Sequence, residues 1–184
     1  EKISTVHADN GHFECDRAII TAGIWSKELM LKLGLNIPLE AERGYHVVYK
    51  NASILPRNPM MMTIGKFGVT PMGSDLRCAG TVELGGIKLG PSKAPIKLLR
   101  RRVAEAFPKM SYDKTEEWFG FRPTAPDSLP LIGQLKESGV YTAFGHQHIG
   151  MTSGPKTGRL IADIINQRSP NIDISVYDPN RYNL

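Results

Sequence analysis

Two strand–turn–helix units, one near each end of the chain, restrict the folds open to this sequence more than any other feature. In the first, residues 17–23 form a short apolar, β-branched run that ends at glycine, which is typical of a strand buried on both faces. A helix that ends at Gly34 is predicted to follow, because apolar residues recur every four positions at Trp25, Leu29 and Leu33. In the second unit, a strand at 140–143 leads through a glycine-rich loop into a helix at about 155–167. Such units build α/β layers.

Between these units the pattern changes to short strands separated by glycine turns. Four strands are predicted there, at 42–50, 60–64, 67–72 and 76–82. A helix at 93–107 follows them and ends before Pro108. A further strand at 117–122 precedes a proline-rich turn at 123–130. Successive strands with short connections predict an antiparallel sheet.

The order of these elements predicts an α+β fold. The two ends would form one α/β layer, and the middle would form a separate antiparallel or mixed sheet. We place the boundaries so that residues 1–36 and 126–184 share one domain and residues 37–125 form the other. A hairpin with its turn at 9–11 opens the chain. Because the chain starts within strand-like alternation, without methionine or an apolar leader, we expect a fragment of a longer protein.

The charge pattern gives little support for nucleic-acid binding. The net charge of +5 is mild, and its densest cluster is Arg100–Arg102 with Lys93 and Lys97 upstream. A nucleic-acid site would need a longer basic stripe with interleaved aromatic residues. We favour a solvated helix face, and we keep peripheral contact with an anionic membrane surface as the alternative. No apolar stretch reaches the roughly 18 residues of a membrane span.

The cysteine and histidine patterns argue against a metal site. Cys15 and Cys78 form no CxxC pair and have no metal-ligand spacing. We expect them to be free, buried thiols in a reducing compartment, the cytoplasm or the inner face of its membrane. His146 and His148 have no acidic or thiol ligand near them in sequence, so we expect no metal.

An arginine near the end of an aromatic strand is a candidate for binding an anion. Arg122 follows the run Trp118–Phe121 and precedes a proline turn, so we expect its guanidinium to be partly buried. A buried cation needs an anionic partner, and a carboxylate satisfies it with two hydrogen bonds. The sequence is equally compatible with an internal ion pair to Asp127 or Glu83.

Two loops follow strands and lead into helices, at about 21–26 and 145–154. Small residues there let a ligand approach the backbone, and a helix start offers N–H groups to an anion. An ordinary strand–helix turn would show the same spacing. The chain contains no GxGxxG run, so it cannot supply a complete dinucleotide site by itself.

Four segments together resemble the second half of the D-amino-acid oxidase superfamily of FAD-dependent oxidoreductases, in particular the D-amino-acid dehydrogenase and glycine oxidase branch. They stand in the family's order: AIITAGIWS, ERGYHVVY, WFGFRPTAPDSLPLIG and FGHQHIGMTSGPKTGRLIADII. The resemblance runs from about residue 3 to residue 167. It implies that 1–36 and 126–184 belong to an FAD-binding domain and that 37–125 form a substrate-binding domain. The main FAD fingerprint would lie outside this chain.

The resemblance also implies roles for individual residues. Arg122 would bind the substrate carboxylate, and Tyr45 and His46 would lie near the substrate. The residues near FAD would be Thr21, Ala22, Gly23, Gly145, His146, Gly150, Met151 and Thr152. No catalytic acid or base is implied, because the family passes a hydride from the substrate α-carbon to the flavin.

The implied activity is oxidation of the C–N bond of a D-amino acid to an imine, which water hydrolyses to a keto acid and ammonia. The electrons would pass to oxygen or to a quinone. Two alternatives stay open at this point. One is an amine oxidase of the glycine or sarcosine type, and the other is a stand-alone binding domain without catalysis.

Overall fold

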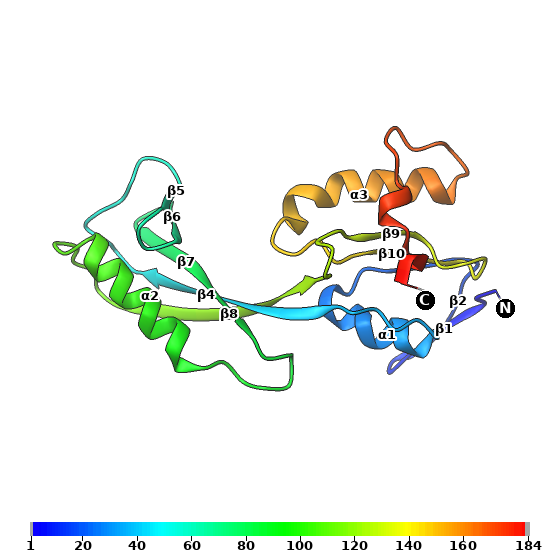
Figure 1. Cartoon of the computed structure of the whole chain (residues 1–184), viewed down its shortest axis with the longest axis horizontal. Coiled ribbons are helices and arrows are strands. Elements are labelled where there is room, and N and C mark those ends of the chain that lie inside the picture. Colours follow the sequence, from blue (N-terminus) through cyan, green and yellow to red (C-terminus); the bar gives the residue numbers. More distant parts are fainter. Residues whose placement is uncertain (1, 183–184) are drawn as a thin grey trace. The chain divides into compact units, whose positions relative to one another are not determined.

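The computed structural model describes residues 2–182, which divide into two compact units (Figure 1). The first unit contains residues up to Glu40 together with those from Arg122 onward. The second unit is the continuous segment Ala41–Phe121. The mixture of helices with several sheets confirms the predicted α+β fold. Within the described residues, no helix has both the length and the apolar character needed to cross a bilayer.

The first unit contains a hairpin and a three-stranded sheet. The hairpin pairs β1 (Thr5–Ala8) with β2 (Gly11–Glu14), as the turn at 9–11 predicts. The sheet has the order β3 (Ala18–Ile20), β10 (Val140–Phe144), β9 (Leu131–Gln134). Strand β10 is parallel to β3 and antiparallel to β9. The sequence did not predict β9, because its four residues follow directly on a proline-rich turn.

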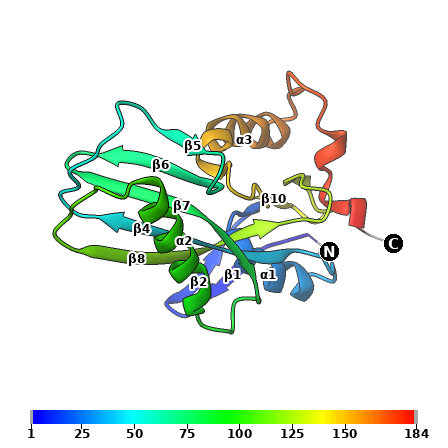
Figure 2. The ribbon, with the colours of Figure 1, turned by 60° about the vertical axis from the view of Figure 1, so that its left-hand side comes forward.

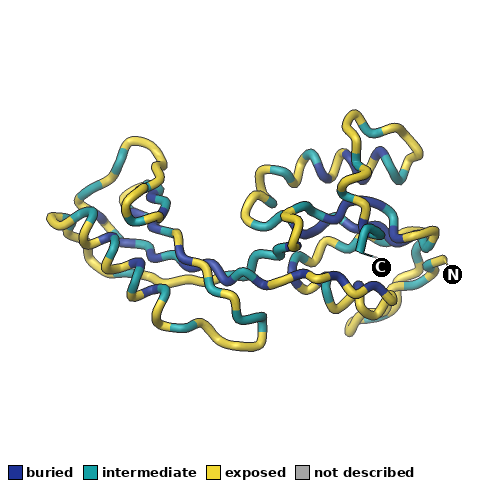
Figure 3. Tube along the Cα trace, viewed as in Figure 1, coloured by how far each residue is buried: buried dark blue, intermediate teal, exposed yellow. Residues whose placement is uncertain are grey.

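Helix α3 (Gly150–Ile165) covers one face of this sheet (Figure 1). Leu160 and Ile161 of the helix pack against Ile132 of β9 and Tyr141 of β10. In Figure 3 the buried stretches of this unit run along β9 and β10, where most residues are inaccessible to solvent. This apolar layer fixes the helix on the sheet and therefore fixes the loop that joins β10 to α3.

The start of α3 differs from the prediction. The helix begins at Gly150 rather than near Pro155, and Pro155 lies inside it. A proline removes a single backbone donor, here the one that would bond the carbonyl of Met151, and packing against the sheet outweighs this loss. The predicted start near Pro155 is therefore wrong.

The burial predicted for the first strand–turn–helix unit is also wrong. Ile19 of β3 is 47% exposed, so the strand is not buried on both faces in the described chain. The turn is a short 3₁₀ segment at Gly23–Trp25, and α1 (Ser26–Lys32) follows it. Ser26 and Met30 form the buried side of the helix, whereas the predicted stripe at Trp25, Leu29 and Leu33 is 42–55% exposed. Apolar residues cover most of this helix, so periodicity alone could not identify the buried side.

The second unit is built on a five-stranded sheet with the order β5-β6-β7-β4-β8. The strands are β4 (Glu40–Tyr49), β5 (Met60–Met62), β6 (Phe67–Met72), β7 (Asp75–Leu84) and β8 (Thr115–Thr124). The pairs β4–β7, β5–β6 and β6–β7 are antiparallel, which confirms the predicted meander. Strands β4 and β8 continue past the ends of this unit into the first one.

Helix α2 (Lys93–Ala106) lies across one face of this sheet (Figure 2). Leu99 and Val103 of the helix share a core with Tyr45 and Val47 of β4. A β-bulge after Tyr45 leaves Gly80 of β7 without a paired residue. A Cβ atom on Gly80 would lie 2.5 Å from the backbone of β6, so only glycine fits at this bulge.

Candidate functional site

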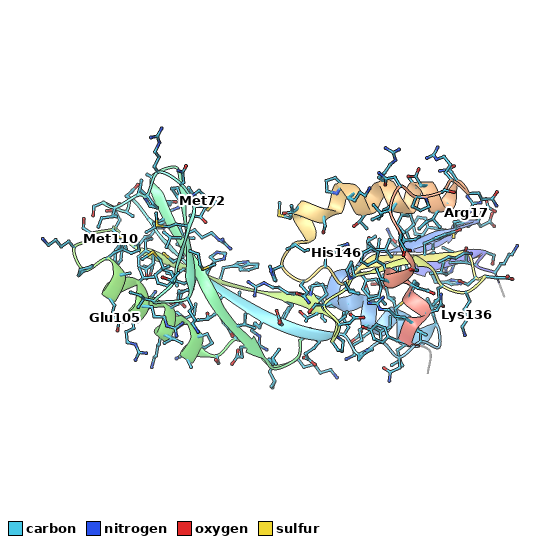
Figure 4. The ribbon with its side chains drawn as sticks, turned by 45° about the horizontal axis from the view of Figure 1, so that its top comes forward. Arg17, Met72, Glu105, Met110, Lys136 and His146 are labelled. Atoms are coloured by element: carbon cyan, nitrogen blue, oxygen red, sulfur yellow. The ribbon has the colours of Figure 1, made fainter. Side chains whose placement is uncertain are left out.

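The two predicted FAD-proximal loops leave the same edge of the three-stranded sheet. Strands β3 and β10 are parallel, with Ile20 opposite Thr142. Their carboxyl ends therefore point in one direction, and residues 21–23 and 145–149 both follow these ends. In open α/β sheets, ligands bind in the crevice outside the carboxyl ends of the strands. His146 lies at this end of β10, and Lys136 lies at the opposite end, as Figure 4 shows.

The glycines in these loops have backbone conformations that other residues adopt rarely. Gly23 has a φ of 56°, and no atom lies within 4 Å of the place where a Cβ would stand. A ligand could therefore approach this backbone closely. Gly145 is buried with a φ of 89°, and a Cβ there would lie 3.3 Å from Cδ1 of Leu131. Gly145 is thus required for the turn itself.

The first turn of α3 has backbone donors that no side chain caps. Ile149 occupies the N-cap position, and its side chain cannot accept a hydrogen bond. The next residues are Gly150, Met151 and Thr152, of which Met151 is 97% exposed. The free N–H groups and the helix dipole together favour a partner with a negative or carbonyl edge. Contact of these residues with the N1–C2=O edge of a reduced flavin, where negative charge develops, stays a prediction.

His146 is held by a hydrogen bond to the helix that follows it. Its Nε2 lies 2.9 Å from Oγ1 of Thr157, which is buried in α3. Burial lowers the pKa of His146, so the imidazole is neutral near pH 7. Among residues 2–182, no group of three or more histidine, cysteine or acidic side chains could hold a metal ion.

The guanidinium of Arg122 has no hydrogen bond or ion pair with any described residue, and the residue is half-buried. The two internal acids that could have neutralised it are paired elsewhere. Asp127 binds Arg181 at 2.8 Å, and Glu83 binds Arg43 at 2.7 Å. Burial is the largest single influence on the pKa of Asp127 and would raise it, but the hydrogen bonds from Arg181, Leu129 and Tyr182 and the charge of Arg181 together lower the pKa to about 2. Neither acid therefore neutralises the guanidinium of Arg122.

The backbone beside Arg122 is joined to the glycine loop. The carbonyl of Pro123 accepts a hydrogen bond of 3.2 Å from the N–H of Gln147. Gln147 adopts the left-handed conformation, with a φ of 52°, in the middle of that loop. This bond fixes the end of β8 next to residues 145–149, all within the first unit.

Tyr45 and His46 belong to the second unit and lie on opposite faces of β4. The hydroxyl of Tyr45 donates to Glu83 and accepts a hydrogen bond of 3.2 Å from the N–H of Ser92. Nδ1 of His46 accepts a hydrogen bond of 3.1 Å from Arg77, and its ring stacks on Trp118. Burial, with the charge of Arg77, lowers the pKa of His46. Their role near the substrate stays a prediction.

A cavity of about 600 Å³ lies inside the second unit, between α2 and β8. Tyr45, Ile96 and Phe119 form part of its apolar wall, and Lys93 and Lys97 also line it. Its position was not expected from the sequence, because it depends on how α2 packs beside β8.

Arg43 is the residue whose importance the sequence did not reveal. It is 1% exposed, and its guanidinium donates to Glu83 and to the carbonyls of Gly86, Leu89 and Gly90. One buried cation thus holds the loop between β7 and α2. The signal was present in the alternation of β4, which places Arg43 on the same face as Tyr45 and Val47.

We expect the second unit to lose stability in acid through Glu83. Hydrogen bonds from the side chains of Tyr45, Ser92 and Arg43 lower the pKa of Glu83 to about 2. A lowered pKa means that the ionised carboxylate stabilises the fold above its unfolded value of 4.5, and that this contribution is lost as the pH falls to about 2. Urea unfolding across this range should show a steeper decline in the free energy of unfolding for the wild type than for Glu83→Gln. Parallel declines would contradict this assignment.

Comparison with known proteins gives a consistent result. A family model described as FAD dependent oxidoreductase (DAO) matches residues 1–164. The chain is 37% identical over 186 residues to a protein named D-amino-acid oxidase from Bradyrhizobium diazoefficiens, and 30% identical over 182 residues to one named glycine oxidase from Pseudomonas aeruginosa. The alignments cover 98% and 97% of this chain but 44% and 50% of those relatives. The chain therefore spans about half the length of the curated relatives it matches.

Solved structures show the same fold. A glycine oxidase from Geobacillus kaustophilus matches with a TM-score of 0.82 at 24% identity, over 94% of this chain and 47% of that one. An L-proline dehydrogenase from P. horikoshii matches with a TM-score of 0.83 at 20% identity, over 99% of this chain and 51% of that one. At these identities the likeness is one of fold.

Proposed function

The chain belongs to the DAO family of FAD-dependent oxidoreductases, and on this premise we propose that its protein oxidises D-amino acids. The C–N bond of the substrate is oxidised to an imine, and hydrolysis of the imine gives a keto acid and ammonia. The electrons then pass to oxygen or to a quinone. The chain of 184 residues contributes the arginine that binds the substrate carboxylate and part of the FAD-binding surface.

The single observation that supports this proposal most is the unpaired guanidinium of Arg122. A half-buried cation without a protein partner is costly unless a ligand supplies the anion. A carboxylate fits the planar guanidinium with two parallel hydrogen bonds. The hydrogen bond between Pro123 and Gln147 places this arginine's backbone beside the proposed flavin loop. Arg122 would thereby orient the substrate α-carbon.

The residues at the sheet edge fit an FAD group. When bound, FAD supplies the hydride acceptor for the reaction. Gly23 leaves its backbone open to close approach, and the uncapped first turn of α3 offers N–H donors to a negative edge. Thr21, Ala22, Gly145, His146, Gly150, Met151 and Thr152 complete the proposed contact surface.

The second candidate is an amine oxidase that acts on glycine or sarcosine. The relative named glycine oxidase is 30% identical to this chain, against 37% for the relative named D-amino-acid oxidase. We favour D-amino acids on this difference. The same arginine would serve both substrate classes, because both carry a carboxylate.

Turnover of a substrate panel by the full-length protein tests the proposal. We expect reduction of an artificial electron acceptor with D-amino acids, and a kcat/KM at least about tenfold lower with glycine and sarcosine, a difference of roughly 1.4 kcal/mol. Oxygen consumption and quinone reduction, measured separately, identify the acceptor. A preference for glycine or sarcosine would favour the second candidate. A full-length protein without bound flavin and without amine turnover would overturn the proposal in favour of a binding domain.

A further inference from the structure

A chain of two hydrogen bonds links the proposed flavin loop to the interior of α3. Nε2 of His146 lies 2.9 Å from Oγ1 of Thr157, and the same Oγ1 lies 3.1 Å from the carbonyl oxygen of Ser153. Thr157 is 6% exposed and sits in the second turn of a helix of 16 residues. The acceptor for His146 is therefore rigidly placed.

The number of hydrogens available to these two hydrogen bonds decides which imidazole nitrogen of His146 carries hydrogen. The hydroxyl of Thr157 has one proton, and a carbonyl oxygen such as that of Ser153 can only accept. The proton of Thr157 is thus donated to Ser153, and the contact with His146 requires the imidazole to donate from Nε2. In the neutral ring, Nδ1 is then an acceptor.

Nδ1 of His146 has no hydrogen-bond partner among residues 2–182. The side chain is half-buried, in the loop that follows β10 (Figure 4). A Cβ on Gly150 would lie 3.5 Å from Cβ of His146, so the start of α3 lies next to this residue. Nδ1 is not fully enclosed by the described residues, so a donor from outside them can reach it.

We infer that Thr157 is a positioning residue, which fixes His146 with Nε2 protonated so that Nδ1 accepts a hydrogen bond from an N–H or O–H group of FAD. This inference rests on the proposed function, because it takes FAD as the ligand of the loop. Thr157 itself does not touch the ligand in this scheme. It acts through the orientation and the tautomer of the imidazole.

Nitrogen-15 NMR of the histidine side chains tests the tautomer directly. The full-length protein is labelled at histidine and compared as apoprotein and after loading with FAD. We expect Nε2 of His146 to resonate as a protonated nitrogen in both states. Nδ1 should resonate as an unprotonated nitrogen that shifts toward the protonated range when FAD binds. A protonated Nδ1, or an Nδ1 signal that FAD leaves unchanged, would overturn the inference.

Thr157→Val removes the hydroxyl and keeps the shape of the side chain. FAD is titrated into the apoprotein, and its binding is followed by its fluorescence. We expect FAD to bind to this variant about three- to tenfold more weakly, which is the effect of one lost hydrogen bond. Thr157→Ser should restore the wild-type affinity. In a His146→Ala background, Thr157→Val should cause no further loss, because both changes remove the same interaction.

A matched control is available in the second unit. Thr81 is also buried, and its hydroxyl has no hydrogen-bond partner, so Thr81→Val should leave FAD affinity unchanged. Wild-type protein that binds no FAD would defeat the proposed function. Wild-type protein that binds FAD, together with a Thr157→Val variant of equal affinity, would defeat this inference alone.

Discussion

Replacing Arg122 with alanine is expected to raise the KM for D-amino acids by about 100- to 1,000-fold, because the substrate carboxylate loses its charged partner in a half-buried site. Arg122→Lys keeps the charge but loses the planar pair of donors, so we expect an intermediate KM. Steady-state kinetics of the full-length protein measure both effects. The lysine variant also shows whether charge or geometry contributes more to binding.

Two controls separate substrate binding from general damage. Arg57 is exposed and has no hydrogen bond or ion pair with any described residue, so Arg57→Ala should leave the KM unchanged. An amine that lacks a carboxylate should be oxidised equally slowly by the wild type and by Arg122→Ala. If Arg122→Ala kept the wild-type KM for D-amino acids, Arg122 would not be the carboxylate-binding residue.

Local patterns were sufficient to predict most elements of the fold. The alternation in β4 and the glycine turns around β6 are properties of neighbouring residues, and the structure agrees with both. The apolar residues Ile96, Leu99 and Val103 recur along one side of α2, and this side is buried against the sheet. In each of these elements a single face is apolar. The spacing of the apolar residues therefore identifies one buried face.

The features that sequence could not predict depend on contacts between distant segments. The sequence left Arg122 with two candidate acids, and the structure pairs those acids with Arg181 and Arg43, at separations of 54 and 40 residues. Likewise, packing of α3 against β9 allows the helix to continue through Pro155. The buried side of α1 depends on the neighbours of Ser26 and Met30, since the opposite side is apolar too.

Arg43→Met is expected to lower the free energy of unfolding of the second unit by about 3 kcal/mol, because it leaves Glu83 and three loop carbonyls without their shared donor. Unfolding can be followed by the fluorescence of Trp118 in a Trp25→Phe background, since the chain has two tryptophans and they lie in different units. Arg101, which is 69% exposed in the side chain, provides the control Arg101→Met, with an expected change below about 0.5 kcal/mol.

The double variant Arg43→Met/Glu83→Gln separates the charge from the loop contacts. If the unpaired carboxylate causes most of the loss, the second change should recover part of the stability, because a neutral amide does not need the cation. The loop carbonyls would stay without their donor, so hydrogen exchange in residues 85–92 should be faster than in the wild type in both variants. Wild-type exchange rates in this loop would show that Arg43 does not hold it, and that the loop is fixed by its hydrogen bond from Ser92 to Tyr45 instead.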